Sequence, residues 1–164
     1  MPLRALLGAL ANDPEGAKLL RDGGDAFVSR SLRPYAIAAL LDNDVAKSAV
    51  VVAGDDNEAQ ALAADLGIWL APRPVRFYPS RGVTYESHLA PPPHLVGLRV
   101  AALDALLDPA EGEPPVVVVS AVALSEKVPD PALRPRGFTL RKGDLIDLDE
   151  AALQLVAAGY ERVS

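Results

Sequence analysis

The chain has 164 residues, half of them apolar, which is enough for one domain, or for one domain and the start of another. Its formal net charge is −6 and its sixteen Lys and Arg residues are scattered, which argues against free-standing nucleic-acid binding. The absence of cysteine excludes disulfides, thiolate zinc sites and a cysteine nucleophile. Because the sequence has neither signal-peptide features nor an apolar run of membrane-spanning length, we expect a cytoplasmic location without membrane contact.

The first quarter of the chain predicts helices around one short strand. Leucines at helical spacing indicate a helix over 3–11, and a second short helix is expected over 15–22. A first strand is expected at Ala26–Ser29. Pro34 then fits the first turn of a helix that runs to about Leu41, because the N–H that proline lacks has no partner there anyway.

The middle of the chain alternates between strand and helix patterns. The β-branched run Ser48–Ala53 is typical of a strand covered on both faces. An aspartate after it is expected to cap a helix that ends at Gly67. Val75–Tyr78 is expected to form a third strand, and a long loop then leads to another helix. The residues predicted to face inward from that helix are Leu95, Leu98, Ala102, Leu103 and Leu106.

The last third contains the predicted domain boundary. Val116–Ser120 is expected to form a fourth buried strand, with Ser120 capping a short helix over 122–127. Prolines 129, 131 and 135 then indicate a linker. Beyond it we expect a strand at 138–141 and a helix that Asp149 caps and that runs through Ala158.

Together these elements predict an α/β fold with a doubly wound, mostly parallel sheet, followed by an incomplete α+β segment. Three regions are expected: a helical lead-in (1–24), an α/β subdomain (25–130) and the start of a further domain (131–164).

The first strand-to-helix turn is where a doubly wound sheet would place a phosphate loop. A working phosphate loop reads G-x-x-x-x-G-K-[ST], since glycines expose backbone N–H groups and the lysine reaches the terminal phosphates. The turn here, S-R-S-L-R-P-Y, has neither glycine nor lysine. Two readings are open, an anion contact or a capped structural turn. The residues of this degenerate turn are Ser29, Arg30, Ser31 and Arg33.

No metal site or catalytic residue is predicted. His88 and His94 are the only histidines and lack helical ligand spacing, and the acids between Asp144 and Glu150 are explained by helix capping. The long loop between the third strand and the next helix carries Tyr85 and Glu86. Their side chains either bind a partner or pack within the loop.

From about Gly24 to Ser164 the sequence resembles the N-terminal, UvrB-like module of the bacterial transcription-repair coupling factor (Mfd). The resemblance rests on the glycine-free first turn, the strand Ser48–Ala53 with its helix, the run FYPSRGVTYESHLAPPPHLVGLRVAAL and the ending FTLRKGDLIDLDEAALQLVAAGYERV. In the family the central run reads approximately F-P-x-W-E-T-L-P-Y-E-x-x-S-P before a helix with an Arg-Leu pair. Tyr85, Glu86 and Arg99 match it, whereas the family tryptophan is replaced in the neighbourhood of Ser80 and Arg81.

The resemblance implies a degenerate helicase-like subdomain without enzyme activity, followed by the opening of the domain that recruits UvrA in nucleotide excision repair. It implies no cofactor for this chain, since ATP and magnesium would bind a separate motor domain, and contacts with DNA and RNA polymerase only through other domains. The possible interaction residues are Tyr85, Glu86, His88 and Arg99. The main UvrA-docking residues would follow Ser164, so the chain is expected to be a fragment or a truncated reading frame.

Two alternatives are open. One is a small nucleotide- or anion-binding α/β enzyme domain that uses the strand ends and the loop around Tyr85, Glu86 and His88. The other is a fragment of the excinuclease protein UvrB itself, whose closing segment is similar. That relative carries an intact phosphate loop at its first turn, which favours the coupling factor.

Overall fold

The structure, a computed structural model, describes residues 3–83, 89–108, 112, 114–128, 130–133, 141–157 and 160. It contains two compact units, Met1–Glu126 and Lys127–Ser164. The boundary follows Glu126, whereas the sequence pattern places it after residue 130.

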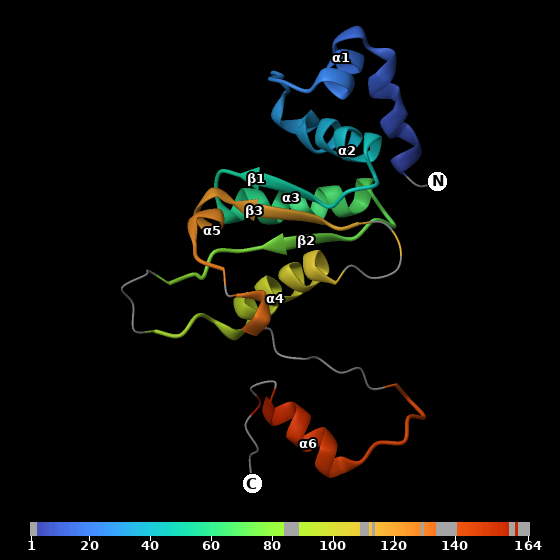
Figure 1. Ribbon diagram of the computed structural model, residues 1–164. Coiled ribbons are helices and arrows are strands. Elements are labelled where there is room, and N and C mark those ends of the chain that lie inside the picture. Colours follow the sequence, from blue (N-terminus) through green and yellow to red (C-terminus); the bar gives the residue numbers. More distant parts are fainter. Residues whose placement is uncertain are drawn as a thin grey trace. The chain divides into compact units, whose positions relative to one another are not determined.

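A three-stranded parallel sheet forms the centre of the first unit (Figure 1). Its strands are β1 (Ala49–Ala53), β2 (Val75–Tyr78) and β3 (Val116–Ser120), in the order β1-β3-β2. The first residues of both outer strands, Ala49 and Val75, lie opposite Val116 of β3. The predicted α/β class is confirmed, and all the pairing in the described part of the chain is parallel.

The expected first strand at Ala26–Ser29 is wrong. Residues 23–29 form no strand, and the chain continues into a 3-10 turn, η2 (Arg30–Leu32), and then α2 (Arg33–Asn43). Gly23 and Gly24 have φ angles of 67° and 114°, which turn the chain sharply, and Phe27 is fully exposed. A four-residue segment such as Ala26–Ser29 does not form a strand without a neighbouring strand to pair with.

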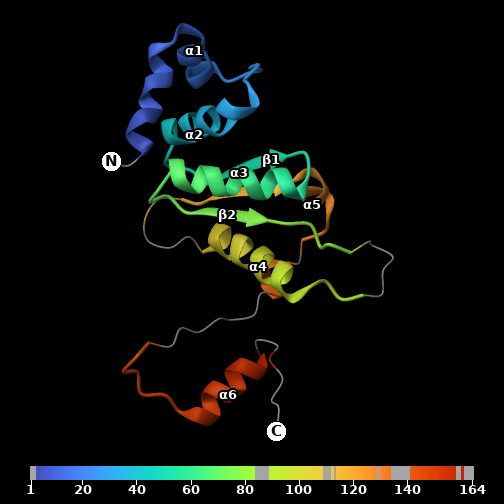
Figure 2. The same cartoon turned by 180° about the vertical axis from the view of Figure 1, so that it is seen from behind.

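Helices cover the sheet on both faces. On one face lies α3 (Asp56–Trp69) (Figure 2). Its Leu66 packs in a core with Val116 and Val118. On the other face lies α4 (Pro93–Leu107), whose Ala102 packs in a second core with the alternate residues of β3. This alternation of side chains along β3 explains why all five of its residues are buried.

The N-terminal helices belong to the same unit as the sheet. They are η1 (Leu3–Asn12) and α1 (Pro14–Asp22), and α2 packs against both η1 and α3. Leu7 is buried in the core on the α3 face. Arg4 donates to Asp42 at 2.6 Å, which links η1 to α2.

Several predicted helix features need correction. The helix α3 continues past Gly67 to Trp69, because Leu70 N–H still reaches the Leu66 carbonyl at 2.9 Å and Gly67 has no positive φ. Leu98, expected to face inward from α4, is 40% exposed. The predicted caps after β1 and β3 are confirmed, since Asp55 accepts from Glu58 N–H and Ser120 accepts from Ala123 N–H.

The second unit contains η3 (Pro131–Leu133) and α6 (Leu148–Ala157). Asp147, not the expected Asp149, caps α6, since its carboxylate accepts from the N–H groups of Asp149 and Glu150 at 2.9 and 3.2 Å. The expected strand at 138–141 and the end of the helix at Ala158 fall outside the described residues, except for Arg141. Across the described residues, every helix is too short or too polar to cross a membrane.

Candidate functional site

The C-terminal edge of the sheet is the candidate site. Parallel α/β sheets bind ligands beyond the carboxyl ends of neighbouring strands whose connections leave to opposite faces. In this sheet β1 leads to α3, whereas its neighbour β3 leads to α5 (Ala121–Ser125), which packs in the core of the α4 face. The switch point therefore lies between β1 and β3.

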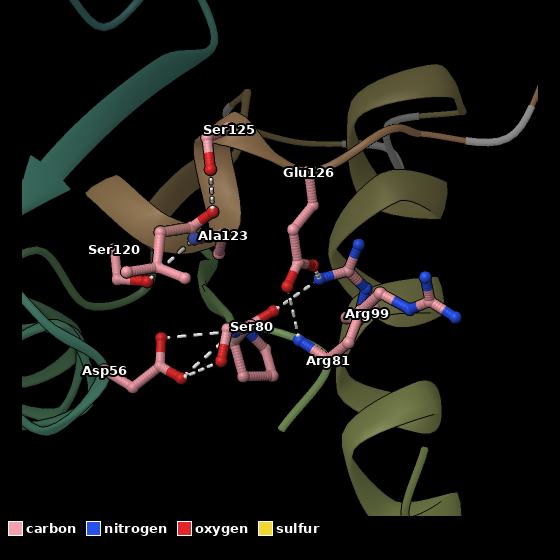
Figure 3. A network of polar contacts seen from close by, with 10 residues as sticks. Asp56, Ser80, Arg81, Arg99, Ser120, Ala123, Ser125 and Glu126 are labelled. Carbon is pink, nitrogen blue, oxygen red and sulfur yellow. Dashed lines mark hydrogen bonds and ion pairs between the residues drawn. The ribbon is translucent and has the colours of Figure 1, made fainter. Parts of the chain in front are cut away.

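Asp56, in the first turn of α3 after β1, hydrogen-bonds to the loop that follows β2 (Figure 3). Its carboxylate accepts from the Ser80 hydroxyl at 2.5 Å and from the Ser80 N–H at 3.1 Å, just beyond β2. The hydroxyl of Ser120, at the end of β3, also acts on this carboxylate and lowers its pKa. A single acidic side chain thus fixes the loop after β2 against the first turn of α3.

The same contacts control the charge of Asp56. Burial by itself raises the pKa of the carboxyl group, but hydrogen bonds from Ser120 and Ser80, together with the positive charge of Arg99, hold that pKa below its ordinary value of 3.8. Asp56 is therefore ionised at neutral pH and places negative charge at the switch point.

Glu126, which directly follows α5, holds the other side of this edge. It accepts from the Arg81 N–H at 3.0 Å and from the Arg99 guanidinium at 2.5 Å, and Arg99 also donates to the Pro79 carbonyl at 2.8 Å (Figure 3). The side chains of Arg99 and Glu126 are only 11% and 18% exposed. This ion pair therefore connects α4, α5 and the loop after β2.

Tyr78, the last residue of β2, lies beneath this ion pair. The Arg99 guanidinium carbon is 4.3 Å from the centre of the Tyr78 ring, a cation–π arrangement. Burial raises the pKa of the phenol above 10.0, the charge of Arg99 opposes the shift, and Glu126 adds to it. Among the described residues, the Tyr78 hydroxyl has no hydrogen-bond partner.

A groove of about 740 Å³ lies beside the end of β1, between η2, α2 and α3. Arg30 and Arg33 line it, so these two residues do lie near the sheet edge although no strand precedes them. Arg33 forms an ion pair with Glu58 at 3.3 Å, and the second oxygen of Glu58 accepts from Gly54 N–H at 3.1 Å. The carboxylate of Glu58 therefore occupies one backbone donor at this end of the groove and also pairs with Arg33.

The other sequence-predicted site residues are spread out. Ser29 precedes η2 and makes no capping bond with its side chain, and Ser31 is exposed. Tyr85, Glu86 and His88 lie outside the described residues. Within the described ranges, no group of three acidic or histidine side chains is placed to hold a metal ion.

Sequence reasoning missed the residues that organise this edge: Asp56, Ser80, Ser120 as a partner of Asp56, and Glu126. Asp56 and Ser80 are 24 residues apart, and Arg99 and Glu126 are 27 apart. The available signal was that Asp56, Ser80 and Ser120 each stand within three residues of a predicted strand end, where parallel strands bring side chains together.

Comparison with known proteins gives no match to this chain among family models, curated proteins or solved structures.

Proposed function

We propose that this chain is a non-catalytic scaffold module of the transcription-repair coupling type, which serves UvrA recruitment in transcription-coupled nucleotide excision repair. ATP hydrolysis, translocation along DNA and contact with RNA polymerase would belong to other domains of a longer protein. In this view the α/β unit supplies a rigid base, and residues 131–164 open the recruiting domain.

One observation supports the proposal most: three backbone donors at the C-terminal edge of the sheet are occupied by carboxylates of the chain. Glu58 occupies Gly54 N–H, Asp56 occupies Ser80 N–H, and Glu126 occupies Arg81 N–H. A nucleotide phosphate needs such N–H groups free and positive charge nearby. Ionised carboxylates in these positions instead repel phosphate, as expected of a nucleotide-type fold that no longer binds nucleotide.

Three described residues behind the sequence resemblance also contact one another. Tyr78 and Pro79, from the run that resembles the family, both contact Arg99, which matches the family's helix. This gives the start of the family-like run a structural role, since Tyr78 and Pro79 lie against α4 through Arg99. It supports a scaffold more than a reactive loop.

Titration with a fluorescent ATP analogue at millimolar magnesium tests the absence of nucleotide binding. We expect no saturable signal from the chain. Saturable micromolar binding that is lost in Arg30→Ala or Arg33→Ala, but kept in the control Arg21→Ala, would overturn the proposal. Arg21 suits as a control because it is exposed and pairs with Asp22, outside the groove.

The groove lined by Arg30 and Arg33 favours a second candidate, a small anion-binding enzyme domain. Arg33 is paired with Glu58, but the groove is large enough for a metabolite. A metabolite-induced rise in melting temperature that Arg30→Ala abolishes would favour this candidate.

The coding sequence beyond Ser164 tests the family part of the proposal. We expect an R-G-x-x-x-D-x-F motif soon after Ser164 and, further on, a motor with an intact G-x-x-x-x-G-K-[ST] loop. A continuation that has the motif together with the features of the excinuclease protein UvrB would favour that alternative. A continuation that has neither the motif nor those features contradicts both the coupling-factor reading and the UvrB reading.

A further inference from the structure

The strand β1 has a free edge. In the described part of the chain it pairs with β3 alone, and its other side is turned towards α2 (Figure 1). Ala49 N–H bonds to the Pro115 carbonyl at 3.1 Å, so the backbone groups of Ala49 and Val51 face β3. Alternate residues of a parallel strand direct their N–H and C=O groups to opposite sides, so those of Val50 and Val52 point to the free edge. No described residue hydrogen-bonds to them, and the two valines are 54% and 51% exposed.

This edge lacks the features that normally keep a strand edge from pairing. At the opposite edge of the sheet, β2 has four residues, lies between Pro74 and Pro79 and carries the exposed Arg76. By contrast β1 has five residues, all apolar, with neither a proline nor a charge among them. Short length, proline and charge all discourage the addition of a strand, so β1 is the edge that is open to a further strand.

The C-terminal half of this edge opens into the groove of about 740 Å³ between η2, α2 and α3. Val52 and Ala53 line the groove from the side of β1, and Ile37 of α2 and Leu62 of α3 add apolar side chains. Ile37 packs against the same core as Val51, so α2 lies on the α3 face of the sheet. A strand added beside β1 would therefore be covered by α2, as inner strands of α/β sheets are covered by helices.

Arg30 places a cation at the end of this groove. It is exposed and makes no ion pair within the described ranges, whereas Arg33 pairs with Glu58. Asp55, another carboxylate of the lining, accepts from Glu58 N–H as the cap of α3. Asp65 also lines the groove but lies more than two helical turns further along α3. Arg30 is therefore available to a carboxylate of a partner.

We propose that the free edge of β1 binds an extended peptide segment of another protein, which adds to the sheet as a strand beside Val50 and Val52. The two N–H and two C=O groups of these valines specify an extended backbone, since only a strand presents matching groups at this spacing. Apolar β-branched residues suit the segment, because the valines flank one of its faces and Ile37 the other. An acidic residue at its end would meet Arg30. This inference goes beyond the proposed scaffold function and does not depend on it.

A second copy of the chain is the competing occupant. Two β1 strands could pair antiparallel about a two-fold axis perpendicular to the sheet. Both α2 helices would then lie on the same face at the joined edge, where each groove has room for a single strand. We therefore expect a monomer in sedimentation velocity of the free chain. A dimer that Val52→Pro dissociates would assign the edge to a second copy and overturn the proposal.

Random peptides of about nine residues, longer than the five residues of β1, supply the probe. They are displayed on phage and selected against the full chain. We expect enrichment of peptides with a β-branched apolar run and an acidic residue at one end, and fluorescence polarisation then gives the dissociation constant of a labelled enriched peptide. Enrichment no greater than on an unrelated protein, or of peptides without such a run, contradicts strand addition.

Methylation of single backbone nitrogens in the enriched peptide tests the pairing without any change to the protein. Where the peptide N–H faces β1, the methyl group removes a donor and should raise the dissociation constant by roughly tenfold or more. At the alternate positions, which face away, the constant should stay within roughly twofold. A scan without this alternation would show that the peptide does not bind as a strand.

Val52→Pro removes the outward N–H of β1 without removing a bond to β3, and proline is tolerated at such edge positions. We expect a rise of roughly tenfold in the dissociation constant of the peptide. The matched control Val52→Thr keeps both the N–H and the β-branched shape and should bind within roughly twofold of the parent chain. Circular dichroism checks that both variants fold, and folded variants that bind alike would overturn the proposal. If the proline variant does not fold, the methylation scan decides.

Arg30→Ala tests the charged contact. It should raise the dissociation constant roughly threefold for the acidic peptide and leave it unchanged for the same peptide with an amide in place of the acid. The control Arg21→Ala, outside the groove, should leave both constants unchanged. Equal effects of Arg30→Ala on the two peptides would contradict the contact between Arg30 and the acid.

Discussion

The two edges of the sheet are each fixed by a buried arginine, but the arginines bind different acceptors. At the N-terminal edge, Arg73 donates to the carbonyl oxygens of Leu41, Lys47 and Pro114 at 2.6, 2.6 and 2.9 Å. At the C-terminal edge, Arg99 donates to a carbonyl and to the carboxylate of Glu126. The three carbonyl acceptors of Arg73 do not titrate, whereas the carboxylate that Arg99 binds can.

This difference places a titratable carboxylate among the acceptors of the arginine at the C-terminal edge. At the N-terminal edge Arg73, which is only 2% exposed, joins the end of α2 to the segments before β1 and β3 through three carbonyl groups. The C-terminal edge, where related architectures bind ligands, holds Asp56 and Glu126 instead. Substitutions at the two edges should therefore differ in both size and pH dependence.

The largest effect is expected at the N-terminal edge. Arg73→Met keeps much of the side-chain volume but leaves three carbonyl groups without their donor, so we expect a loss of about 3 kcal/mol or more in the free energy of unfolding. Urea denaturation followed by circular dichroism measures it. The control Arg76→Met, at an exposed position of β2, should change stability by less than about 0.5 kcal/mol, and equal losses would contradict the role given to Arg73.

At the C-terminal edge, Glu126→Ala removes the acceptor of both Arg99 and Arg81 N–H. Because Arg99 is mostly buried, we expect a loss of about 2 kcal/mol at pH 7, less than for Arg73, since Arg99 keeps the Pro79 carbonyl and the Tyr78 ring. Arg99→Met in the same background should then cost less than it does alone. Additive losses in this double-mutant cycle would show that the two side chains do not act together.

The local features of both edges follow from the sequence, whereas the contacts that join distant segments do not. Val116–Ser120 is β-branched almost throughout, and Asp55 and Ser120 are standard capping residues, so the strand and both caps were predictable. The strand expected at Ala26–Ser29 failed because a strand depends on a neighbour that four residues cannot specify.

The organising side chains of the candidate site were not predictable for a related reason. From the sequence, Asp56 is an ordinary acidic residue in the first turn of a helix. It gains its partners beyond the neighbouring strands only because the parallel register brings Ser80 and Ser120 to the same edge. Arg73 stands in a proline-rich turn where an exposed arginine would be expected, and three chain segments converge on it only in the folded protein.

The pH dependence of stability distinguishes the edges further. The pKa of Asp56 is below 3.8 in the folded chain, so its stabilising contribution is fully present above pH 3.8 and is lost as the pH falls through the folded-state pKa. Asp56→Asn should cost about 1 kcal/mol at pH 7 and less at pH 3. Unfolding curves at both pH values measure this, and a cost that does not shrink in acid would exclude an ionised Asp56 as the acceptor.

The smallest effect is expected at Tyr78, whose hydroxyl is a buried polar group at the C-terminal edge. In the described part of the chain its buried hydroxyl has no hydrogen-bond partner, so Tyr78→Phe removes no bond and should leave stability unchanged or raise it by up to about 1 kcal/mol. The control Tyr35→Phe removes a hydrogen bond to the Leu6 carbonyl at 3.2 Å and should be slightly destabilising.

Because burial holds the phenol pKa above 10.0, neutral Tyr78 contributes stability that is lost as the pH rises above 10.0, and Tyr78→Phe should remove that alkaline loss. A destabilised Tyr78→Phe at neutral pH would mean that the hydroxyl does have a partner, and the packing between Arg99 and the second core would need revision.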